Sequence, residues 1–163
     1  MTERVEIRLA REGEYDRVAD ILATAYAPSG LRPGDDYYQH LRDVAGRVAA
    51  AEVWVAVEGS EVLGTVTWPP VGSPEREVAG DDEAEFRMLA VDPRVQGLGI
   101  GRALVEAIVR RARSEGFRRI VLSTTTWSTS ARRLYADMGF VRVPERDWPV
   151  NDDLVLQAYA LEL

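Results

Sequence analysis

A glycine-rich segment between a predicted strand and a predicted helix constrains this chain more than any other feature. The segment reads Gln96-Gly97-Leu98-Gly99-Ile100-Gly101-Arg102. It follows an apolar run, Phe86 to Val91, and it opens an amphipathic stretch, Arg102 to Glu115. Glycine allows positive φ and a close approach of the backbone to a ligand. Because a helix N-terminus favours an anion, the segment predicts a pyrophosphate cradle.

Two common nucleotide-binding loops do not fit this segment. A Walker A loop requires Gly-Lys-Ser/Thr, and the chain has no lysine, because all 20 basic residues are arginine. A Rossmann loop requires G-x-G-x-x-G. The last position of that pattern is Arg102 when it starts at Gly97, and Leu104 when it starts at Gly99. A glycine-rich turn that binds no ligand remains an alternative for the glycines taken alone.

A third pattern, Gln/Arg-x-x-Gly-x-Gly/Ala, fits Gln96, Gly99 and Gly101. Preceded by Leu89-Ala90-Val91-Asp92-Pro93, it resembles the GNAT superfamily of acetyl-CoA-dependent N-acetyltransferases. The resemblance implies that acetyl-CoA is the acyl donor and that residues 97–102 hold its pyrophosphate. The cofactor-binding residues that it implies are Leu89, Ala90, Val91, Gln96, Gly97, Leu98, Gly99, Ile100, Gly101, Arg102 and Ser128.

Composition narrows the class of protein further. A length of 163 residues indicates one domain with its own core. No apolar run approaches a membrane span, and Met1 to Arg4 lack a signal-peptide pattern, so we expect a cytoplasmic protein. Zero cysteines exclude disulfides and a Cys nucleophile, and a single histidine, His40, excludes a multi-His metal site. A net charge of −7 disfavours nucleic acid as the main partner.

Apolar periodicity predicts seven strands and four helices. The strands are expected at Val5–Leu9, Val53–Val57, Val62–Trp68, Ala84–Val91, Arg118–Ser123, Phe140–Val143 and Leu154–Leu161. The helices are expected at Glu12–Ala27, Asp35–Ala51, Arg102–Glu115 and Ser128–Met138, with a long loop over Pro69–Asp82. This order matches the GNAT fold over the whole chain, residues 1–163. The resemblance therefore implies an α/β (α+β) domain whose mixed, mostly antiparallel sheet is split by a cofactor wedge between its fourth and fifth strands.

Tyr135 is the candidate catalytic acid. It lies in Ala131-Arg132-Arg133-Leu134-Tyr135-Ala136-Asp137-Met138-Gly139-Phe140, which resembles the second GNAT signature. In that family the tyrosine protonates the leaving thiolate. A phenol with a pKa near 10 is a credible donor to a thiolate with a pKa of about 8.5. The structural alternative is a core tyrosine packed with Leu134 and Met138.

Glu85 is the candidate base that deprotonates the acceptor amine. Some members of the superfamily place a glutamate at this point of the strand, and Glu83 lies on the same face. Both carboxylates are equally well interpreted as solvated strand-end groups. The chain departs from the family pattern at two places. Ser123 stands where other members have a glutamate that acts as the base, and Ser128 stands where many have an asparagine. These departures affect the assignment of the base more than that of the cofactor.

Two acidic regions are candidates for the acceptor side. The stretch Pro74 to Glu85 contains six carboxylates and one base, Arg76. Asp35, Asp36, Tyr37, Tyr38 and His40 form an acidic-aromatic cluster that is able to attract an ammonium group. A solvated acidic surface is the alternative for both. Arg146-Asp147-Trp148 is a further candidate by position alone.

The sequence predicts an N-acetyltransferase in which a primary amine, on a small molecule or a peptide, attacks acetyl-CoA directly. Glu85 takes the proton and Tyr135 protonates CoA. No metal, nucleic acid or membrane is expected, and a homodimer is possible. Two alternatives stay open, which are a non-catalytic acyl-CoA-binding module and an acetyltransferase for a protein N-terminus or lysine.

Overall fold

The computed structural model describes residues 4–163, so of the N-terminal stretch discussed above Met1 to Glu3 lie outside the described residues. The strands are β1 (Val5–Leu9), β2 (Glu52–Glu58), β3 (Glu61–Trp68), β4 (Glu83–Val91), β5 (Arg119–Thr124), β6 (Val141–Arg142), β7 (Trp148–Asn151) and β8 (Leu154–Glu162). The α-helices are α1 (Tyr15–Tyr26), α2 (Asp36–Arg42), α3 (Val44–Val48), α4 (Ile100–Ser114) and α5 (Thr129–Asp137). Short 3-10 turns cover Glu12–Glu14, Ala27–Ser29, Pro93–Val95 and Pro144–Arg146.

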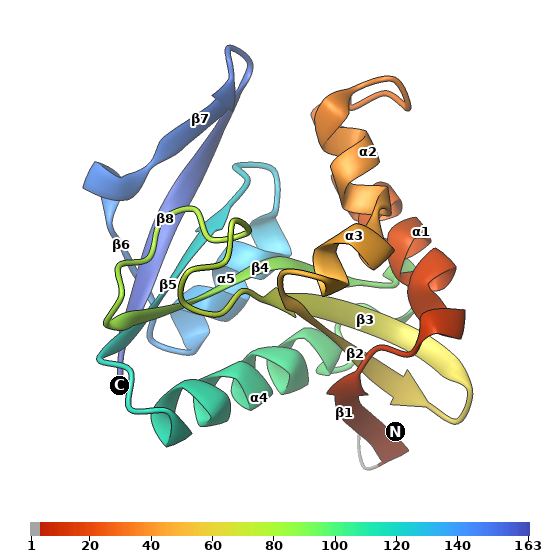
Figure 1. The fold of residues 1–163 in the computed structure, drawn as a ribbon, viewed down its shortest axis with the longest axis horizontal. Helices are drawn as coiled ribbons and strands as arrows, with labels where there is room; N and C mark the ends of the chain where they lie inside the picture. Colours follow the sequence, from red (N-terminus) through yellow and green to blue (C-terminus); the bar gives the residue numbers. More distant parts are fainter. Residues whose placement is uncertain (1–3) are drawn as a thin grey trace.

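The strands form one open sheet in the order β1-β2-β3-β4-β5-β8-β6, and β7 pairs with β8 outside this path. Pairing is antiparallel except between β4 and β5, which run parallel. Figure 1 shows α4 along one face of this sheet and α1 to α3 on the other. The fold class expected from the sequence, a mixed and mostly antiparallel sheet flanked by helices, is confirmed.

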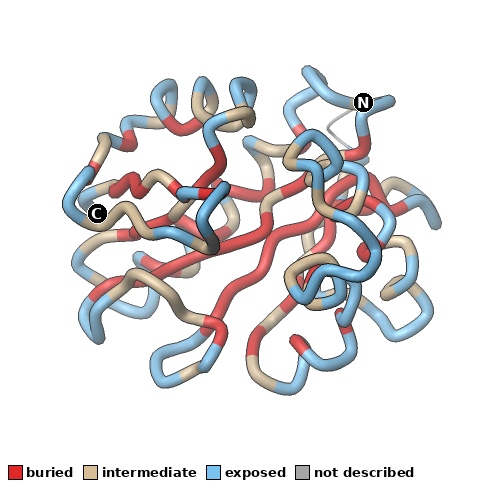
Figure 2. The backbone as a smooth tube through the Cα atoms, turned by 90° about the horizontal axis from the view of Figure 1, so that it is seen from above, coloured by how far each residue is buried: buried red, intermediate tan, exposed pale blue. Residues whose placement is uncertain are grey.

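Two apolar cores lie on the two faces of the sheet. On one face, α4 places Leu104, Val105 and Ile108 against buried residues of β3, β4 and β5. On the other face, α1 places Val18 and Leu22 against β2 and β3. Figure 2 shows the buried central strands running between exposed loops and helices. The sheet is therefore held from both sides, and burial of this apolar surface is the main source of its stability.

The helix predicted over Asp35–Ala51 is two helices in the structure. The chain breaks at Asp43, whose φ of −82° and ψ of 67° are not helical. The Asp43 carboxylate accepts a hydrogen bond of 3.0 Å from the Gly46 backbone and so caps α3. A short polar side chain that bonds nearby backbone favours such a cap over a helix interior. The apolar periodicity was continuous across the break and did not indicate it.

Strand β7 was not predicted from the sequence. It contains Pro149, which cannot donate a ladder hydrogen bond, and proline within a run argues against a strand. Here the proline lies in a strand that pairs with β8 alone, so only one of its edges has to be satisfied. Figure 1 shows β7 and β8 forming an arm at one end of the sheet.

Candidate functional site

The candidate site begins at a bulge in β4. Thr65 and Thr67 of β3 pair with Ala90 and Arg87, so two residues of β4 oppose one of β3. Within this bulge Met88 has a φ of +56°, the one positive φ at a non-glycine residue in the described chain. Bulges bend a strand, and such backbone strain is frequent at functional sites.

Beyond the bulge, β4 and β5 separate. Their parallel pairing covers Glu83 to Phe86 of β4 and stops there. Residues 87–91 of β4 are therefore unpaired on the side that faces β5, and their backbone groups are free to bind an extended ligand as an added strand does. The predicted wedge between the fourth and fifth strands is present in the structure.

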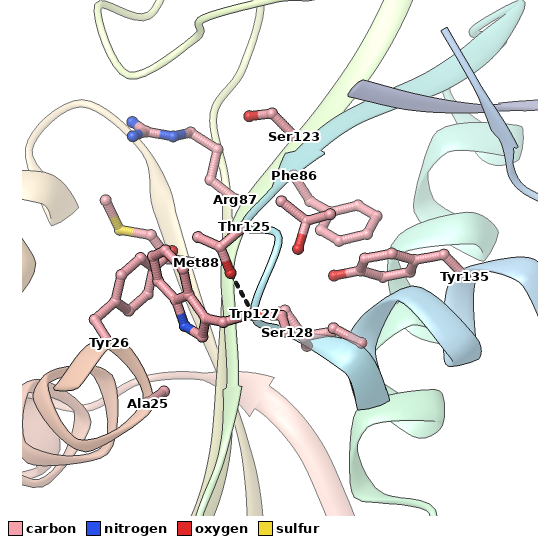
Figure 3. A pocket seen from close by; sticks show the side chains of 13 residues that line it. Ala25, Tyr26, Phe86, Arg87, Met88, Ser123, Thr125, Trp127, Ser128 and Tyr135 are labelled. Carbon is pink, nitrogen blue, oxygen red and sulfur yellow. Dashed lines mark hydrogen bonds between the residues drawn. The ribbon is translucent and has the colours of Figure 1, made fainter. Parts of the chain in front are cut away.

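A pocket lies where the two strands separate, and we call it the wedge pocket. Its lining comes from α1, the bulge, the end of β5 and the start of α5 (Figure 3). It encloses about 430 Å³ of empty space, counting its open mouth. The lining residues are Ala25, Tyr26, Phe86, Arg87, Met88, Leu89, Ser123, Thr124, Thr125, Trp127, Ser128, Ala131 and Tyr135.

Tyr135 lines the wedge pocket with its hydroxyl. The ring is only 3 % exposed and packs against Phe86, Phe140 and Tyr159. In Figure 3 the hydroxyl points toward Thr125 and away from the body of α5. Burial raises the pKa of this phenol above its ordinary value, so the group stays protonated at neutral pH. The side chain is thus a core aromatic whose protonated hydroxyl faces the pocket.

The glycine-rich segment has the geometry of an anion-binding helix start. Gly97 and Gly99 have φ values of +82° and +86°, which side chains rarely adopt. Gly99 is the N-cap of α4, a helix of 15 residues whose first N–H groups lack intrahelical partners. Gln96, Leu98 and Arg102 are exposed here, whereas Ile100 turns its side chain into the core. An anion at this point meets the backbone and the positive end of the helix dipole.

The other predicted cofactor residues lie along the same wedge. Leu89 and Val91 are half-buried and Ala90 is buried, and all three belong to the unpaired edge of β4. Ser128 lies at the start of α5, and its hydroxyl shares a hydrogen bond with Thr125 across the pocket floor (Figure 3). The structure therefore places Leu89 to Val91 on the β4 side of the wedge and Ser128 across from them at the start of α5, with Gly101 near both Val91 and Leu134 of α5.

Glu85 does not lie in the wedge pocket. Its side chain is fully buried, and its carboxylate accepts hydrogen bonds of 3.0–3.1 Å from the backbone N–H groups of Glu77, Val78 and Ala79. Such bonds to an ionised group each contribute about 1.5–3 kcal/mol. The geometry supports an anchor for the loop between β3 and β4 and gives no access to an amine. The alternative of a solvated carboxylate is also not what the structure shows.

Glu83 is a second buried anchor. Its side chain is 1 % exposed and forms ion pairs with Arg118, Arg119 and Arg146. Its carboxylate also accepts a hydrogen bond of 2.8 Å from the Gly80 backbone N–H. Arg146, a candidate for the acceptor side in the sequence analysis, forms an ion pair with Glu83 in this cluster. Asp147 pairs with Arg142 and caps the Ala158 backbone, so it too is structural.

The predicted acidic-aromatic cluster divides in the structure. Tyr37 packs on Tyr26, and the partly exposed His40 ring lies 3.0 Å from a Glu75 carboxylate oxygen. Asp35 and Asp36 are exposed, and Asp35 accepts a hydrogen bond from the Arg32 backbone. Two of its five residues, Asp35 and Asp36, therefore lie at the solvated start of α2, as the alternative interpretation held for them.

Arg87 joins the loop between β3 and β4 to the wedge pocket. The side chain is 8 % exposed, and its Nη1 donates 2.9 Å bonds to the Glu75 carboxylate and carbonyl. Its Nε forms an ion pair with Glu77. Burial raises the pKa of the Glu77 carboxyl to about 7; Arg87 works against this shift, while Glu85 and Glu75 add to it. The glutamates of this acidic stretch are thus buried or half-buried and bonded, whereas Asp81 and Asp82 are exposed.

Most lining residues were not predicted as site residues from the sequence, among them Tyr26, Arg87, Met88 and Trp127. Tyr26 ends α1, Trp127 precedes α5, and their rings contact edge to face with centroids 6.4 Å apart. Arg87 and Met88 lie in the bulge. No local pattern distinguishes Tyr26 or Trp127 from ordinary aromatic residues. The bulge also has no signature in the sequence, because it becomes visible only through the register with β3.

Comparison with known proteins agrees with this geometry. The model of the acetyltransferase (GNAT) family matches residues 15–140. A rat protein named N-acetyltransferase 8F1 is 35 % identical over 98 residues, which are 60 % of this chain and 43 % of that protein. Two rat proteins named N-acetyltransferase 8B and N-acetyltransferase 8 are covered to 38 % and 50 %, so this chain spans about half or less of such relatives.

Solved structures share the fold at low sequence identity. A GCN5-related N-acetyltransferase from Kribbella flavida superposes with a TM-score of 0.71 at 22 % identity, covering 100 % of both chains. A putative acetyltransferase from Salmonella typhimurium, solved with its cofactor acetyl-CoA, gives a TM-score of 0.70 at 22 % identity and covers 98 % of this chain and 94 % of that one. With the family model matched over most of its length, the chain belongs to the GNAT family of acetyltransferases.

Proposed function

We propose that the protein transfers the acetyl group of acetyl-CoA to a small primary amine by direct attack in a ternary complex. The observation that carries this proposal is the position of the Tyr135 hydroxyl in the wedge pocket, next to the unpaired edge of β4. Acetyl-CoA as donor is supported by family membership and by the acetyl-CoA complex of the Salmonella typhimurium neighbour. The chain has no cysteine to form a thioester intermediate, which favours direct attack.

The proposed cofactor residues come from β4, the glycine-rich segment and the start of α5. The pyrophosphate lies on the backbone of residues 97–102, where the α4 dipole favours negative charge. Leu89, Ala90 and Val91 offer backbone N–H and C=O groups to the pantetheine amides, and Ser128 offers a hydroxyl. A free N–H of this edge also polarises the thioester carbonyl, as in an oxyanion hole.

Groups in the pocket then take part in each step of the acetyl transfer. The neutral amine attacks the thioester carbon, the carbon–sulfur bond breaks, and Tyr135 gives its proton to the thiolate. Because Glu85 is occupied by three backbone amides, we expect water in the pocket to take the proton of the amine. Holding both reactants together supplies much of the rate. The contact between Tyr26 and Trp127 narrows the pocket, which favours a small amine over a protein segment.

A screen of amines with acetyl-CoA tests the proposal. Release of free thiol is measured at steady state, with Tyr135→Phe as the matched variant. At least one amine is expected to release thiol well above the rate of hydrolysis. Stabilisation by acetyl-CoA without turnover of any amine would instead identify a non-catalytic binding module. Turnover restricted to peptides with a free N-terminus or a lysine would favour the protein-acetylating alternative.

A further inference from the structure

The wedge pocket has an apolar end and a hydroxyl end. Tyr26 at the end of α1, Met88 in the bulge and Trp127 before α5 form the apolar end, which we call the aromatic wall. In Figure 3 these three side chains lie on one side of the pocket and Tyr135 lies on the other. The hydroxyl end comes from β5 and α5 with the loop between them, and it consists of Ser123, Thr124, Thr125, Ser128 and Tyr135. An acceptor that reacts near Tyr135 therefore extends its remaining part toward the aromatic wall.

The aromatic wall is held by ring contacts. Tyr26 and Trp127 meet edge to face, with their ring planes at 81°. Behind them Tyr37 packs edge to face on Tyr26, with ring centroids 5.8 Å apart. Tyr26 and Trp127 are half-buried, so each keeps apolar surface that a ligand is able to cover. Because aromatic rings bury a large area and pair specifically with a further ring, the wall favours an apolar group and above all an aromatic one.

Arg87 is the one charged residue among the 13 residues that line the wedge pocket, and its charge is already balanced. Its Nη1 donates to the Glu75 carboxylate at 2.9 Å, and its Nε forms an ion pair with Glu77. The Tyr37 hydroxyl also interacts with the guanidinium. A second charge on the acceptor would therefore lack a free partner in the described lining. Because burial of an unpaired charge is costly, the pocket favours an acceptor without one.

We propose that the acceptor is a monoamine whose remaining part is apolar and uncharged, best an arylalkyl group, and that the aromatic wall binds this part; this inference rests on the proposed N-acetyltransferase function. The amine lies toward the hydroxyl end, where Tyr135 is the proposed proton donor. The pocket encloses about 430 Å³ with its open mouth and also has to admit the thioester of acetyl-CoA. The apolar part of the acceptor is therefore small.

Matched acceptors test the exclusion of a second charge. L-Phenylalanine and L-phenylalaninamide share a ring and an amine, and only the first carries a carboxylate. Values of kcat/KM are compared after correction for the fraction of free amine, because the amines differ in pKa. The carboxylate is expected to lower kcat/KM by about 10-fold or more, since it is buried without a partner. Pentylamine and cadaverine form a second pair, in which the added charge is an ammonium group, and the same direction is expected.

Variants of Trp127 test the aromatic wall. The parent protein is expected to prefer 2-phenylethylamine to methylamine, because only the former covers the wall. Trp127→Ala removes the ring, and the ratio of the two kcat/KM values is expected to fall by about 10-fold or more. Trp127→Phe keeps a ring at the same place and should retain most of the preference. A rise in Tm with acetyl-CoA in both variants shows that the fold and the cofactor site remain.

Ala25→Arg should relax the exclusion of a carboxylate. Ala25 is half-buried, lines the pocket and lies in the last turn of α1, where a cation is favourable. The new guanidinium supplies the partner that a carboxylate lacks, so the difference between phenylalanine and phenylalaninamide is expected to fall below about threefold. Ala23→Arg is the matched control, because Ala23 is also half-buried on α1 but does not line the pocket. It should keep the difference.

The outcomes distinguish this inference from the proposed function. Equal or faster turnover of the charged member of each pair would overturn the apolar acceptor and leave the N-acetyltransferase activity standing. A preference for 2-phenylethylamine that survives in Trp127→Ala would overturn the role of the aromatic wall. Failure of every amine, apolar or charged, would contradict the proposed function itself and this inference with it.

Discussion

The proposed cofactor side and the proposed acceptor side of the wedge are built by different means. On the cofactor side, residues 89–102 rely on backbone groups, two glycines with positive φ and the start of α4. On the acceptor side, Arg87 is held by ion pairs to Glu75 and Glu77 from a loop ten or more residues away, and Glu85 ties that loop down. The first side is local in sequence, and the second is assembled from distant segments.

This difference indicates which substitutions are able to change the choice of acceptor and which change the binding of acetyl-CoA. A backbone cradle depends on conformation, so few side chains alter it except where glycine is required. An ionic cluster depends on several side chains at once, and loss of one leaves its partners buried and unpaired. We therefore expect substitutions on the acceptor side to alter stability and acceptor choice together, whereas those on the cofactor side, apart from strain at the two glycines, alter the binding of acetyl-CoA.

The largest expected effect concerns the backbone cradle. Gly99→Glu places a side chain and a negative charge where the pyrophosphate is proposed to lie, at a φ that side chains rarely adopt. A ligand at 100 times its Kd stabilises the native state by about 2.7 kcal/mol. The variant should lose the rise in Tm that acetyl-CoA gives to the parent protein. Thermal unfolding with acetyl-CoA, NAD and ATP at equal concentration measures this.

Gly59→Glu is the matched control for this experiment. Gly59 also has a positive φ, +62°, but it lies in the turn between β2 and β3, away from the wedge. It should lower Tm by a similar strain and keep the shift with acetyl-CoA. If acetyl-CoA does not stabilise the parent protein, the backbone cradle is not a cofactor site.

The next effect concerns Tyr135, which stands between the two sides. Tyr135→Phe keeps the ring and its packing on Phe86 and Phe140 but removes the proton. We expect kcat to fall about 10- to 1000-fold, with little change in the affinity for acetyl-CoA. Single-turnover kinetics show whether chemistry limits the rate. An unchanged chemical step would return Tyr135 to a purely structural role.

Glu85→Gln tests whether this carboxylate is an anchor or a base. Gln has one acceptor oxygen where the carboxylate has two, and its NH2 group opposes the N–H donors of residues 77–79. As an anchor, the variant should lose about 2–3 kcal/mol of unfolding free energy. Chemical denaturation measures this, and Asp81→Asn, an exposed change in the same loop, should stay within about 0.5 kcal/mol.

The pH profile of activity completes the test of Glu85. If Glu85 were the base, the variant would lose activity most near neutral pH and recover at alkaline pH, where free amine is abundant. As an anchor, its activity relative to the parent should not depend on pH in this way. Alkaline recovery without loss of stability would establish the base and contradict the anchor.

The smallest effect concerns Glu77 and has a defined sign. Burial raises the pKa of this carboxyl in the folded state to about 7, above its ordinary value of 4.5. Between these two values the folded state binds more protons than the unfolded state, so stability falls as pH rises. Glu77→Gln removes this dependence. Relative to the parent, the variant should therefore gain about 1–3 kcal/mol on going from pH 5 to pH 8.

Denaturation curves of both proteins at the two pH values measure this gain. The comparison is internal to each protein, so any cost of the substitution that does not depend on pH cancels. A relative stability that does not change with pH would mean that Glu77 is ionised throughout, and the ionic cluster would then be less desolvated than its burial indicates.

Much of the fold was predictable because it depends on local patterns. The apolar periodicity of residues 102–115 placed α4, and alternation placed β2, β3 and β4 to within one or two residues. The break at Asp43 was missed, since a cap bond to Gly46 competes with helix continuation only by a small margin. Strand β7 was missed because its pairing with β8 outweighs the local effect of Pro149.

The sequence by itself determined the family, the glycine-rich helix start and the candidacy of Tyr135, because each depends on residues that are near neighbours in the chain. The tertiary structure alone decided that Glu83 and Glu85 are buried anchors, since their partners lie on the preceding loop and on β5 and the turn before β7. It also decided that Tyr26, Arg87 and Trp127 line one pocket. These residues meet only because the bulge at Met88 ends the pairing of β4 with β5, and strand register is a property of two strands rather than of either one.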